Sequence, residues 1–486
     1  MHGMNVGVTW TYLGATSIAG AYTITLIEPV VWNVGSEIVI TTTGDKFSPG
    51  QSEVKRIVGK SADNKTLTLN SQLKYTHLSE KRTVGTQKPV DIYVRAEVAL
   101  LTRNVVFQGN NDDSWAPLLS APACPSGFDP SEFAVQTCFL GRYGPELGTD
   151  QFGATIMLSG VMGQPGQPES VIGRFSNVEL FHVGQAYRLG RYPIHFHMNG
   201  DMPSSYVSEC AIHQSFNRAT NIHASNYITV ERTVIYDIMG GAFFLEDGIE
   251  IGNTFKNNLA IFVKTSSSSI NEDITPAAFW ATNPNNTYVG NTVAGCSHFG
   301  FWYRLKDTPD GPSYTPNYHP NKVLMGKFDN NTVHSTGRFG LWIFPQYTPT
   351  SKGWTNKDLT PSVAVFSNFV AYSNDKGAEF DQSNNVQFKN MIIWDSYTTA
   401  IEAQTVFRNE DVNSYYRPFF FDPIKGPVVS DTIIIGSSTD PQNSYTQVGL
   451  LVPWDRGELI SNVSFYNFPD ATTPAIRPPI IHGRCS

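Results

Sequence analysis

The chain contains 486 residues, which is enough for two or three ordinary domains or for one long repetitive domain. Its formal net charge is -8 and no basic patch stands out, so the sequence argues against a nucleic-acid-binding protein. No stretch of about twenty apolar residues occurs, and we therefore expect no membrane span within the chain. Only 16% of the residues are charged, whereas Asn, Ser, Thr, Gly and aromatic residues are plentiful, a composition typical of β-rich extracellular proteins.

Residues 1–110 are expected to form an all-β segment. Residues 34–40, 65–69 and 98–107 alternate or run apolar over strand lengths, and turn residues separate them. The first four residues lead directly into strand-like sequence without a signal peptide, so we interpret the chain as a piece of a longer protein.

Residues 111–150 are predicted to be a polar, Pro-rich insertion loop. Cys124 and Cys138 bracket part of this loop and are the best candidates for a disulfide. Cys210 and Cys296 fall inside apolar strand patterns, which predicts buried thiols.

An imperfect repeat occupies residues 151–486. An apolar strand ending in His or an aromatic residue is followed, after five or six residues, by Gly or Ala and a second apolar strand. His213 and Tyr236 are 23 residues apart, and Tyr372 and Trp394 are 22 apart. A coil of a parallel β-helix requires such a period, with two or three short strands per unit. We predict a right-handed parallel β-helix of the pectin-lyase type, because the rival β-sandwich array explains the strands but not the repeat.

The repeat also predicts how side chains line up between coils. His213 and His334 fall in the same column as Tyr236, Tyr372 and Trp394, which indicates a stacking ladder. Insertions at 306–321 and 346–360 are expected to emerge from one edge and wall a groove. Left-handed backbone turns are expected at the recurring asparagines Asn258, Asn291, Asn331, Asn368 and Asn390.

The run RYPIHFHMNGD, residues 191–201, combines a strand pattern with reactive side chains. Period-two alternation places His195 and His197 on one strand face, roughly 6.5 Å apart along the strand. The following turn returns Asp201 towards them, and Arg191 is suited to a uronate carboxylate. The histidines are candidates for acid–base work or for metal ligation with a carboxylate. The alternative is that they cap the outer face and hydrogen-bond to neighbouring turns.

A second candidate is the run Glu246-Asp247-Gly248, which ends an apolar strand and is followed by Glu250. Neighbouring carboxylates can supply acid and base for glycosidic cleavage, or bind calcium through oxygen. The alternative is a solvated turn. Repeat alignment places His223 in the preceding coil, so these groups are expected on one face.

Aromatic and basic residues near the insertions are candidates for substrate binding. Trp302 and Tyr303, if exposed, would stack on sugars, and Arg304 would steer an anionic chain. The alternative is that the rings cover the coils as core.

Glycosylation sequons begin at Asn64, Asn285, Asn330 and Asn462 and permit an extracellular setting.

Several blocks of the sequence resemble one known family. RYPIHFHMNGD, VRAEVALLTRNVVFQG and FFLEDGIEIGNTF resemble fibrocystin-L and the cell-migration-inducing hyaluronidases. ITPAAFWATNPNNT and HFGFWYRLKDTPDGPSYTP look closer to fibrocystin-L. The resemblance implies an eight-glycine domain followed by parallel β-helix repeats, in a cell-surface or secreted protein. This chain would begin at or just beyond the end of the eight-glycine domain.

The function predicted from this resemblance is an extracellular ectodomain module that contacts glycans, matrix proteins or cell-surface proteins. The first alternative is a hyaluronan-depolymerising hydrolase, in which His195 and His197 assist while Glu246 or Asp247 supplies the acid. The second alternative is a structural spacer. No agreed catalytic set is carried across from the family, and a bound calcium or other divalent ion is left open.

Overall fold

The computed structural model describes residues 1–109, 153–161, 169–185, 189–265, 271–351, 360–404, 424–453, 457–469 and 471–478. The predicted loop 111–150, with the proposed Cys124–Cys138 pair, lies outside these ranges. The described part is almost entirely β, with one short helix, α2 (Asn271–Ile274), and two 3-10 turns, η1 (Gly311–Ser313) and η2 (Pro320–Lys322). Within it, no helix is long and apolar enough to cross a membrane.

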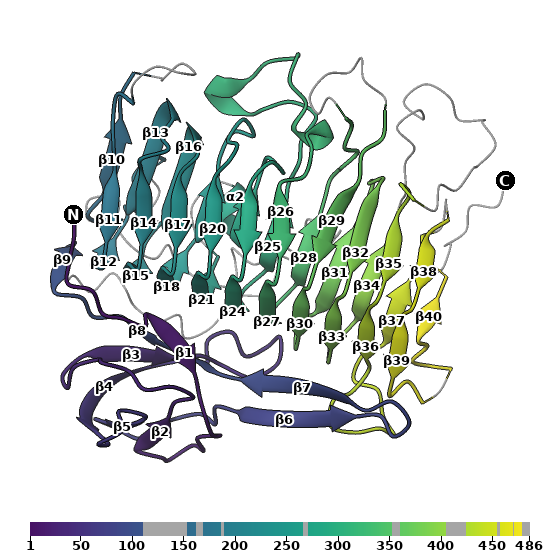
Figure 1. Ribbon diagram of the computed structural model, residues 1–486, viewed down its shortest axis with the longest axis horizontal. Helices are drawn as coiled ribbons and strands as arrows, with labels where there is room; N and C mark the ends of the chain where they lie inside the picture. The colour runs from purple at the N-terminus through teal and green to yellow at the C-terminus, as the bar shows by residue number, and fades with distance from the viewer. Residues whose placement is uncertain are drawn as a thin grey trace, which may run out of the picture.

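Three parallel sheets run along the molecule and together form a β-helix, as predicted (Figure 1). Sheet one contains β10 (Ile156–Ser159), β13 (Ile194–Asp201), β16 (Thr220–Asn226), β19 (Phe243–Leu245), β22 (Ala277–Ala281), β25 (Phe299–Tyr303), β28 (Phe339–Ile343), β31 (Lys376–Phe380), β34 (Thr399–Ala403), β37 (Val448–Leu451) and β40 (Ile476–Arg477). Sheet two contains β11 (Arg174–Ser176), β14 (Tyr206–Ser208), β17 (Thr229–Glu231), β20 (Thr254–Lys256), β23 (Thr287–Val289), β26 (Lys327–Asp329), β29 (Ala364–Ser367), β32 (Val386–Lys389), β35 (Val428–Ser430) and β38 (Leu459–Ser461). Sheet three contains β9 (Val105–Gln108), β12 (Val178–Val183), β15 (Ala211–Ser215), β18 (Val234–Met239), β21 (Leu259–Lys264), β24 (Thr292–Cys296), β27 (Thr332–Thr336), β30 (Val370–Tyr372), β33 (Ile392–Trp394), β36 (Ile433–Ile435) and β39 (Ser464–Tyr466).

The interior of the cylinder is apolar because alternate side chains of every strand point inward. In sheet one, Phe243, Phe279 and Phe301 occupy one interior column, and successive rings stack at centroid distances of 4.6 and 4.4 Å. One coil cannot bury such rings alone, so stacking of coils creates the core. Cys210 and Cys296 lie within this core as free thiols, as the sequence predicted.

The N-terminal segment folds into an antiparallel sheet and a two-stranded ribbon. The sheet has the order β1 (Trp10–Tyr12), β8 (Glu97–Leu100), β3 (Glu37–Ile40), β4 (Glu53–Lys60), β5 (Thr66–Leu69) and β2 (Thr23–Thr25). The ribbon pairs β6 (Ser79–Val84) with β7 (Val90–Arg95) and extends along the lower side of the β-helix in Figure 1. The β-helix itself begins with β9, within the last residues of the segment expected to be N-terminal.

The N-terminal segment packs on the predicted aromatic ladder of sheet three. Successive coils align His213 with Tyr236, and farther along His334, Tyr372 and Trp394 share the same column. The last three rings stack at centroid distances of 4.7 and 4.5 Å. Apolar residues of β6, β7 and β8 cover this face, so the ladder is an interface between the two parts of the chain.

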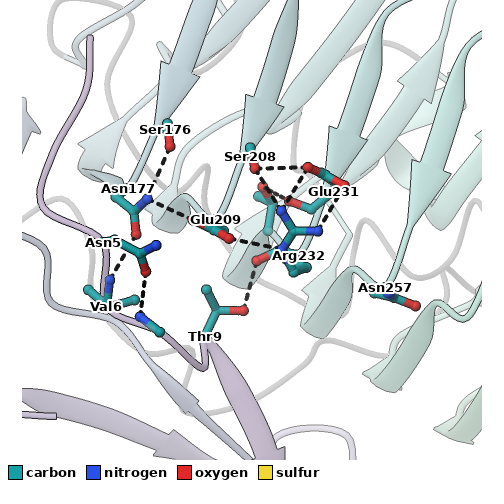
Figure 2. A network of polar contacts seen from close by, with 12 residues as sticks. Asn5, Val6, Thr9, Ser176, Asn177, Ser208, Glu209, Glu231, Arg232 and Asn257 are labelled. Carbon is teal, nitrogen blue, oxygen red and sulfur yellow. Dashed lines mark hydrogen bonds and ion pairs between the residues drawn. The ribbon is translucent and has the colours of Figure 1, made fainter. Parts of the chain in front are cut away.

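Polar contacts fix the first residues of the chain to the coil edges (Figure 2). The Asn177 side chain accepts a hydrogen bond from the Val6 amide and donates one to Glu209. Glu209 in turn pairs with Arg232 at 2.9 Å, and the Arg232 carbonyl accepts a hydrogen bond from Thr9. These partners lie more than 170 residues along the chain from Val6 and Thr9. The contacts therefore connect the start of the chain to three successive coils.

The expected left-handed turns are confirmed at Asn368 and Asn390, which have φ values of 52° and 54°. The expectation was wrong for the other three asparagines, which form a buried ladder. The Asn291 side-chain oxygen accepts the Asn258 amide at 3.0 Å, and the Asn331 side chain repeats this contact with Asn291 at 3.0 Å. The left-handed residue comes one position earlier in each case, at Asn257, Gly290 and Asn330.

Candidate functional site

A cavity of about 480 Å³ lies on the outer face of sheet one, over β13, β16 and β19. Its walls come from successive coils and from the 306–321 insertion, which supplies Asp310, Gly311 and Pro312. The insertion was expected to wall a groove, and it does so here. The other lining residues are Met157, Leu189, Gly190, His195, His197, Arg218, His223, Phe244, Glu246, Asp247, Trp280 and Arg304.

Strand register brings three histidines together in this cavity. β13 pairs with β16 so that His197 lies beside His223, while His195 lies beside Asn221. The register shifts directly after His197, where Met198 adopts a left-handed φ of 53°. Such a bulge redirects the side chains around it. Each of the three imidazoles offers a nitrogen within 4.8 Å of the others.

A backbone hydrogen bond fixes the orientation of the His195 ring. Its Nδ1 lies 3.0 Å from the Gly190 carbonyl oxygen, which can only accept, so Nδ1 carries the hydrogen. The side chain is 1% exposed, and burial lowers the pKa of His195 to about 4. His195 is therefore neutral at physiological pH, with the lone pair on Nε2, which lies 4.0 Å from the Glu246 carboxylate.

His223 is oriented by Asp247. Its Nε2 donates to the Asp247 carboxylate at 2.8 Å, and Ser313 of the insertion donates to the same oxygen at 2.6 Å. Burial opposes a charge on His223, but the Asp247 hydrogen bond and the nearby Glu246 raise its pKa above the ordinary value. The Asp247 side chain is only 3% exposed. It therefore positions His223 and is hardly accessible to a ligand in the cavity.

Glu246 is the carboxylate that faces the three histidines. Its Oε2 lies 3.6 Å from Nδ1 of His223 and 4.0 Å from Nε2 of His195. The side-chain amide of Asn221 donates a hydrogen bond to the same oxygen at 2.7 Å. The side chain remains 22% exposed, so Glu246 is accessible to a ligand in the cavity.

Glu250 shapes the turn that presents Glu246 and Asp247. It is completely buried, and its carboxylate accepts the amides of Ala224, Asp247 and Gly248 at 2.8–2.9 Å. The sequence marked Glu250 only as a neighbour of the acidic run. The structure makes it a positioning residue, because its three acceptor contacts connect the turn to the β16 coil.

Arg218 was not predicted from the sequence, yet it forms the back of the cavity. Its Nε donates to Asp273 at 2.7 Å, Nη1 lies 3.6 Å from Glu246, and the guanidinium lies 3.7 Å from the ring centroid of Phe244. Burial opposes the charge, but Asp273 and Glu246 raise the pKa of Arg218 above its ordinary value. Asp273 is 55 residues away in the chain, so local sequence carries no signal of this pair.

The aromatic predictions require correction. Tyr303 points into the cylinder and is fully buried, so it cannot contact an external sugar. Trp302 points outward but is 5% exposed, because it packs between Trp280 and Trp342 in an outer ladder. The cavity wall instead contains Trp280 and Arg304, whose guanidinium lies 5.5 Å from the Trp280 ring centroid.

Two other predicted residues lie outside the cavity lining. Arg191 is exposed beside β13, and Asp201 accepts a hydrogen bond from Asn226 at the far end of the strand. Among the predicted glycosylation sites, Asn285, Asn330 and Asn462 are exposed and Asn64 is half-buried. Their modification stays a prediction.

Comparisons with known proteins agree with this architecture. Residues 151–341 match the CEMIP beta-helix family. Human fibrocystin-L is 43% identical over the whole chain, and mouse fibrocystin-L is 42% identical. The chain belongs to the fibrocystin-L and CEMIP family. It spans 11% of the length of each of these two relatives, so it corresponds to a small part of them.

More distant relatives extend the family. Mouse fibrocystin is 27% identical over 98% of this chain and 11% of its own length. A G8 domain-containing protein of Dictyostelium discoideum is 30% identical over 70% of this chain and 27% of its own.

Solved structures resemble the chain weakly. The catalytic domain of a GH87 α-1,3-glucanase in complex with nigerose is 11% identical, with a TM-score of 0.28 over 98% of this chain and 99% of that one. The A-module of a mannuronan C-5 epimerase from Azotobacter vinelandii is 11% identical, with a TM-score of 0.23 over 67% and 90%. Likenesses at this level carry no functional information.

Proposed function

We propose that the chain is an extracellular ectodomain module of the fibrocystin-L type, and that it contacts acidic glycans through the cavity over β13, β16 and β19. One observation carries the proposal: a cavity of about 480 Å³ combines ionisable side chains with an aromatic wall on the outer face of the β-helix. Sugar-binding sites need such a combination of hydrogen-bonding groups and aromatic surface.

Arg304 is the residue best placed to select an acidic sugar. Its side chain is 21% exposed, and its Nη1 lies 3.5 Å from the Asp310 carboxylate. A uronate carboxylate entering the cavity would find the same guanidinium, which suits planar carboxylates. The adjacent Trp280 is 1% exposed, so it packs beneath the Arg304 guanidinium and does not itself stack on the sugar.

The test is equilibrium binding of size-defined hyaluronan oligosaccharides and of neutral glucan oligosaccharides to the full chain. We expect the acidic sugar to bind, and Arg304→Ala to weaken it about tenfold, as loss of a charged hydrogen bond does. Arg56→Ala is the matched control, because Arg56 is 58% exposed and lies on the N-terminal sheet. Equal binding by both variants would refute the assigned site, and no binding by the wild type would favour the structural spacer.

A second candidate function, hydrolysis of the glycan, is favoured by the position of Glu246. The predicted catalytic set needs the histidines and an acidic residue in contact with one substrate, and the side chains of His195 and Glu246 are 4.0 Å apart. In this mechanism Glu246 would supply the acid to the glycosidic oxygen, and His195 and His197 would assist. Asp247 would hold His223 instead of supplying the acid.

The size distribution of high-molecular-mass hyaluronan after incubation with the chain tests this second function. Hydrolysis predicts shortened polymer with the wild type and unchanged polymer with Glu246→Gln or His197→Ala. Full-length polymer after incubation with the wild type would exclude hydrolysis by this chain and leave glycan binding unaffected.

A further inference from the structure

Two of the three clustered histidines lack a partner that buried polar atoms normally have. Within the described residues, His195 Nε2 and His197 Nδ1 are both buried without a hydrogen-bond partner. Leaving such an atom unpaired costs about 1–3 kcal/mol, so buried polar groups are seldom left in this state without a reason. Two unpaired nitrogens in one cluster point to a ligand that both would bind.

We propose that His195, His197 and His223 bind a divalent transition-metal ion of the zinc class. Their nitrogens lie within 4.8 Å of one another. Three nitrogens around tetrahedral zinc lie about 3.3 Å apart, given zinc–nitrogen bonds of about 2.0–2.1 Å. Binding the ion therefore requires the three imidazoles to move closer together, by up to about 1.5 Å between a pair of nitrogens.

The surroundings of the histidines match those of metal ligands. A ligating imidazole usually donates its second N–H to a carbonyl or a carboxylate, which fixes the ring and its tautomer. His195 donates Nδ1–H to the Gly190 carbonyl, and His223 donates Nε2–H to Asp247. These contacts leave Nε2 of His195 and Nδ1 of His223 as the available donors, both on the Glu246 side.

The donor atoms also decide which ions fit. Imidazole nitrogen suits zinc, copper, nickel and iron, whereas calcium and magnesium select oxygen ligands. Calcium, left open by the sequence, therefore does not fit the three histidines. Glu246 faces the same point from the cavity side, and a site with three protein ligands open to a cavity resembles catalytic zinc sites more than closed structural ones.

Zinc titration of the metal-stripped full chain tests the proposal, with metal content per chain measured in parallel. We expect one zinc per chain in the wild type and no stoichiometric binding in His195→Gln or His223→Gln. Asp247→Asn keeps all three ligands but loses the orienting carboxylate, and should weaken zinc binding about 10- to 100-fold. The titration contains no carbohydrate, so its outcome is separate from that of glycan binding.

His213→Gln is the matched control. His213 also contacts a carboxylate, Glu179 at 3.0 Å, but it lies on sheet three, away from the cavity. We expect this variant to bind zinc like the wild type. His197→Gln, at a half-buried position, covers the case in which a variant at a more buried histidine fails to fold. A wild type that binds no zinc, or zinc binding that survives both His195→Gln and His197→Gln, would overturn the proposal.

Discussion

At the scale of single residues, His298 makes stability depend on pH. It is completely buried before β25, and burial together with the nearby Arg338 lowers its pKa to about 3. An unfolded chain has an ordinary histidine pKa of about 6.5. Between these values the unfolded chain binds a proton that the folded chain does not, so stability falls as the pH is lowered through this window.

The expected loss attributable to His298 between pH 7 and pH 4 is about 3 kcal/mol of unfolding free energy. Urea unfolding of the wild type and of His298→Gln at both pH values, with a chelator present, measures it. The carboxylates titrate in both proteins, so the difference isolates His298. Identical pH dependence in the two proteins would show that His298 is not buried in its neutral form.

Single residues also show where sequence analysis reaches its limit. His195, His197 and Glu246 were selected because strand alternation and repeat alignment place them on one outer face, and the structure brings them together. Arg218 was missed because its partner Asp273 comes from a different coil. Tyr303 was misassigned because alternation says which residues share a face, but a strand of bulky apolar residues does not say which face is the interior.

At the scale of elements, the buried asparagine ladder holds the turns between sheets two and three. Asn291 is fully buried, accepts the Asn258 amide and donates to the Phe255 carbonyl at 3.0 Å. Removing its side chain would leave both groups unsatisfied. We expect Asn291→Ala to lower the unfolding free energy by about 2–4 kcal/mol, since each unpaired buried group costs about 1–3 kcal/mol.

Asn330→Gly is the control for this prediction. Asn330 has a left-handed φ of 54° and is exposed, and glycine adopts that conformation without strain. We expect a change within about 1 kcal/mol. Chemical denaturation measures the unfolding free energy of both variants. Equal unfolding free energies would contradict the structural role of the ladder.

The elements were predictable to different degrees. The period of 22–23 residues identified the coils, because each coil must repeat the same inward-facing positions. The asparagine ladder was confused with the turns beside it, since ladder and left-handed residues are adjacent in sequence and both favour asparagine. The two roles differ in burial, and composition does not report burial.

At the scale of the whole molecule, the N-terminal segment acts as a cover for sheet three. It buries Tyr372 and Trp394 under β6 and β7, and Tyr236 under β8 and its neighbours. Glu97 adds a contact with His334 at 3.2 Å. Exposed aromatic surface of this extent promotes association.

A chain comprising residues 104–486 should therefore aggregate, whereas the full chain remains monodisperse. Size-exclusion chromatography of the two proteins at equal concentration measures the difference. A truncated chain that elutes as a single monomeric species would contradict the covering role. The sequence predicted that the segment packs on the β-helix or continues it, and the structure shows both relations.

The central claim is that the cavity over β13, β16 and β19 is the functional surface of this module. Hydrogen–deuterium exchange with and without hyaluronan oligosaccharide tests it most directly, because exchange locates protection along the chain. We predict protection in the turn 246–248 and in residues 304–313 of the insertion, with none in the N-terminal sheet. Protection confined to other regions, or no protection at saturating oligosaccharide, would contradict the claim.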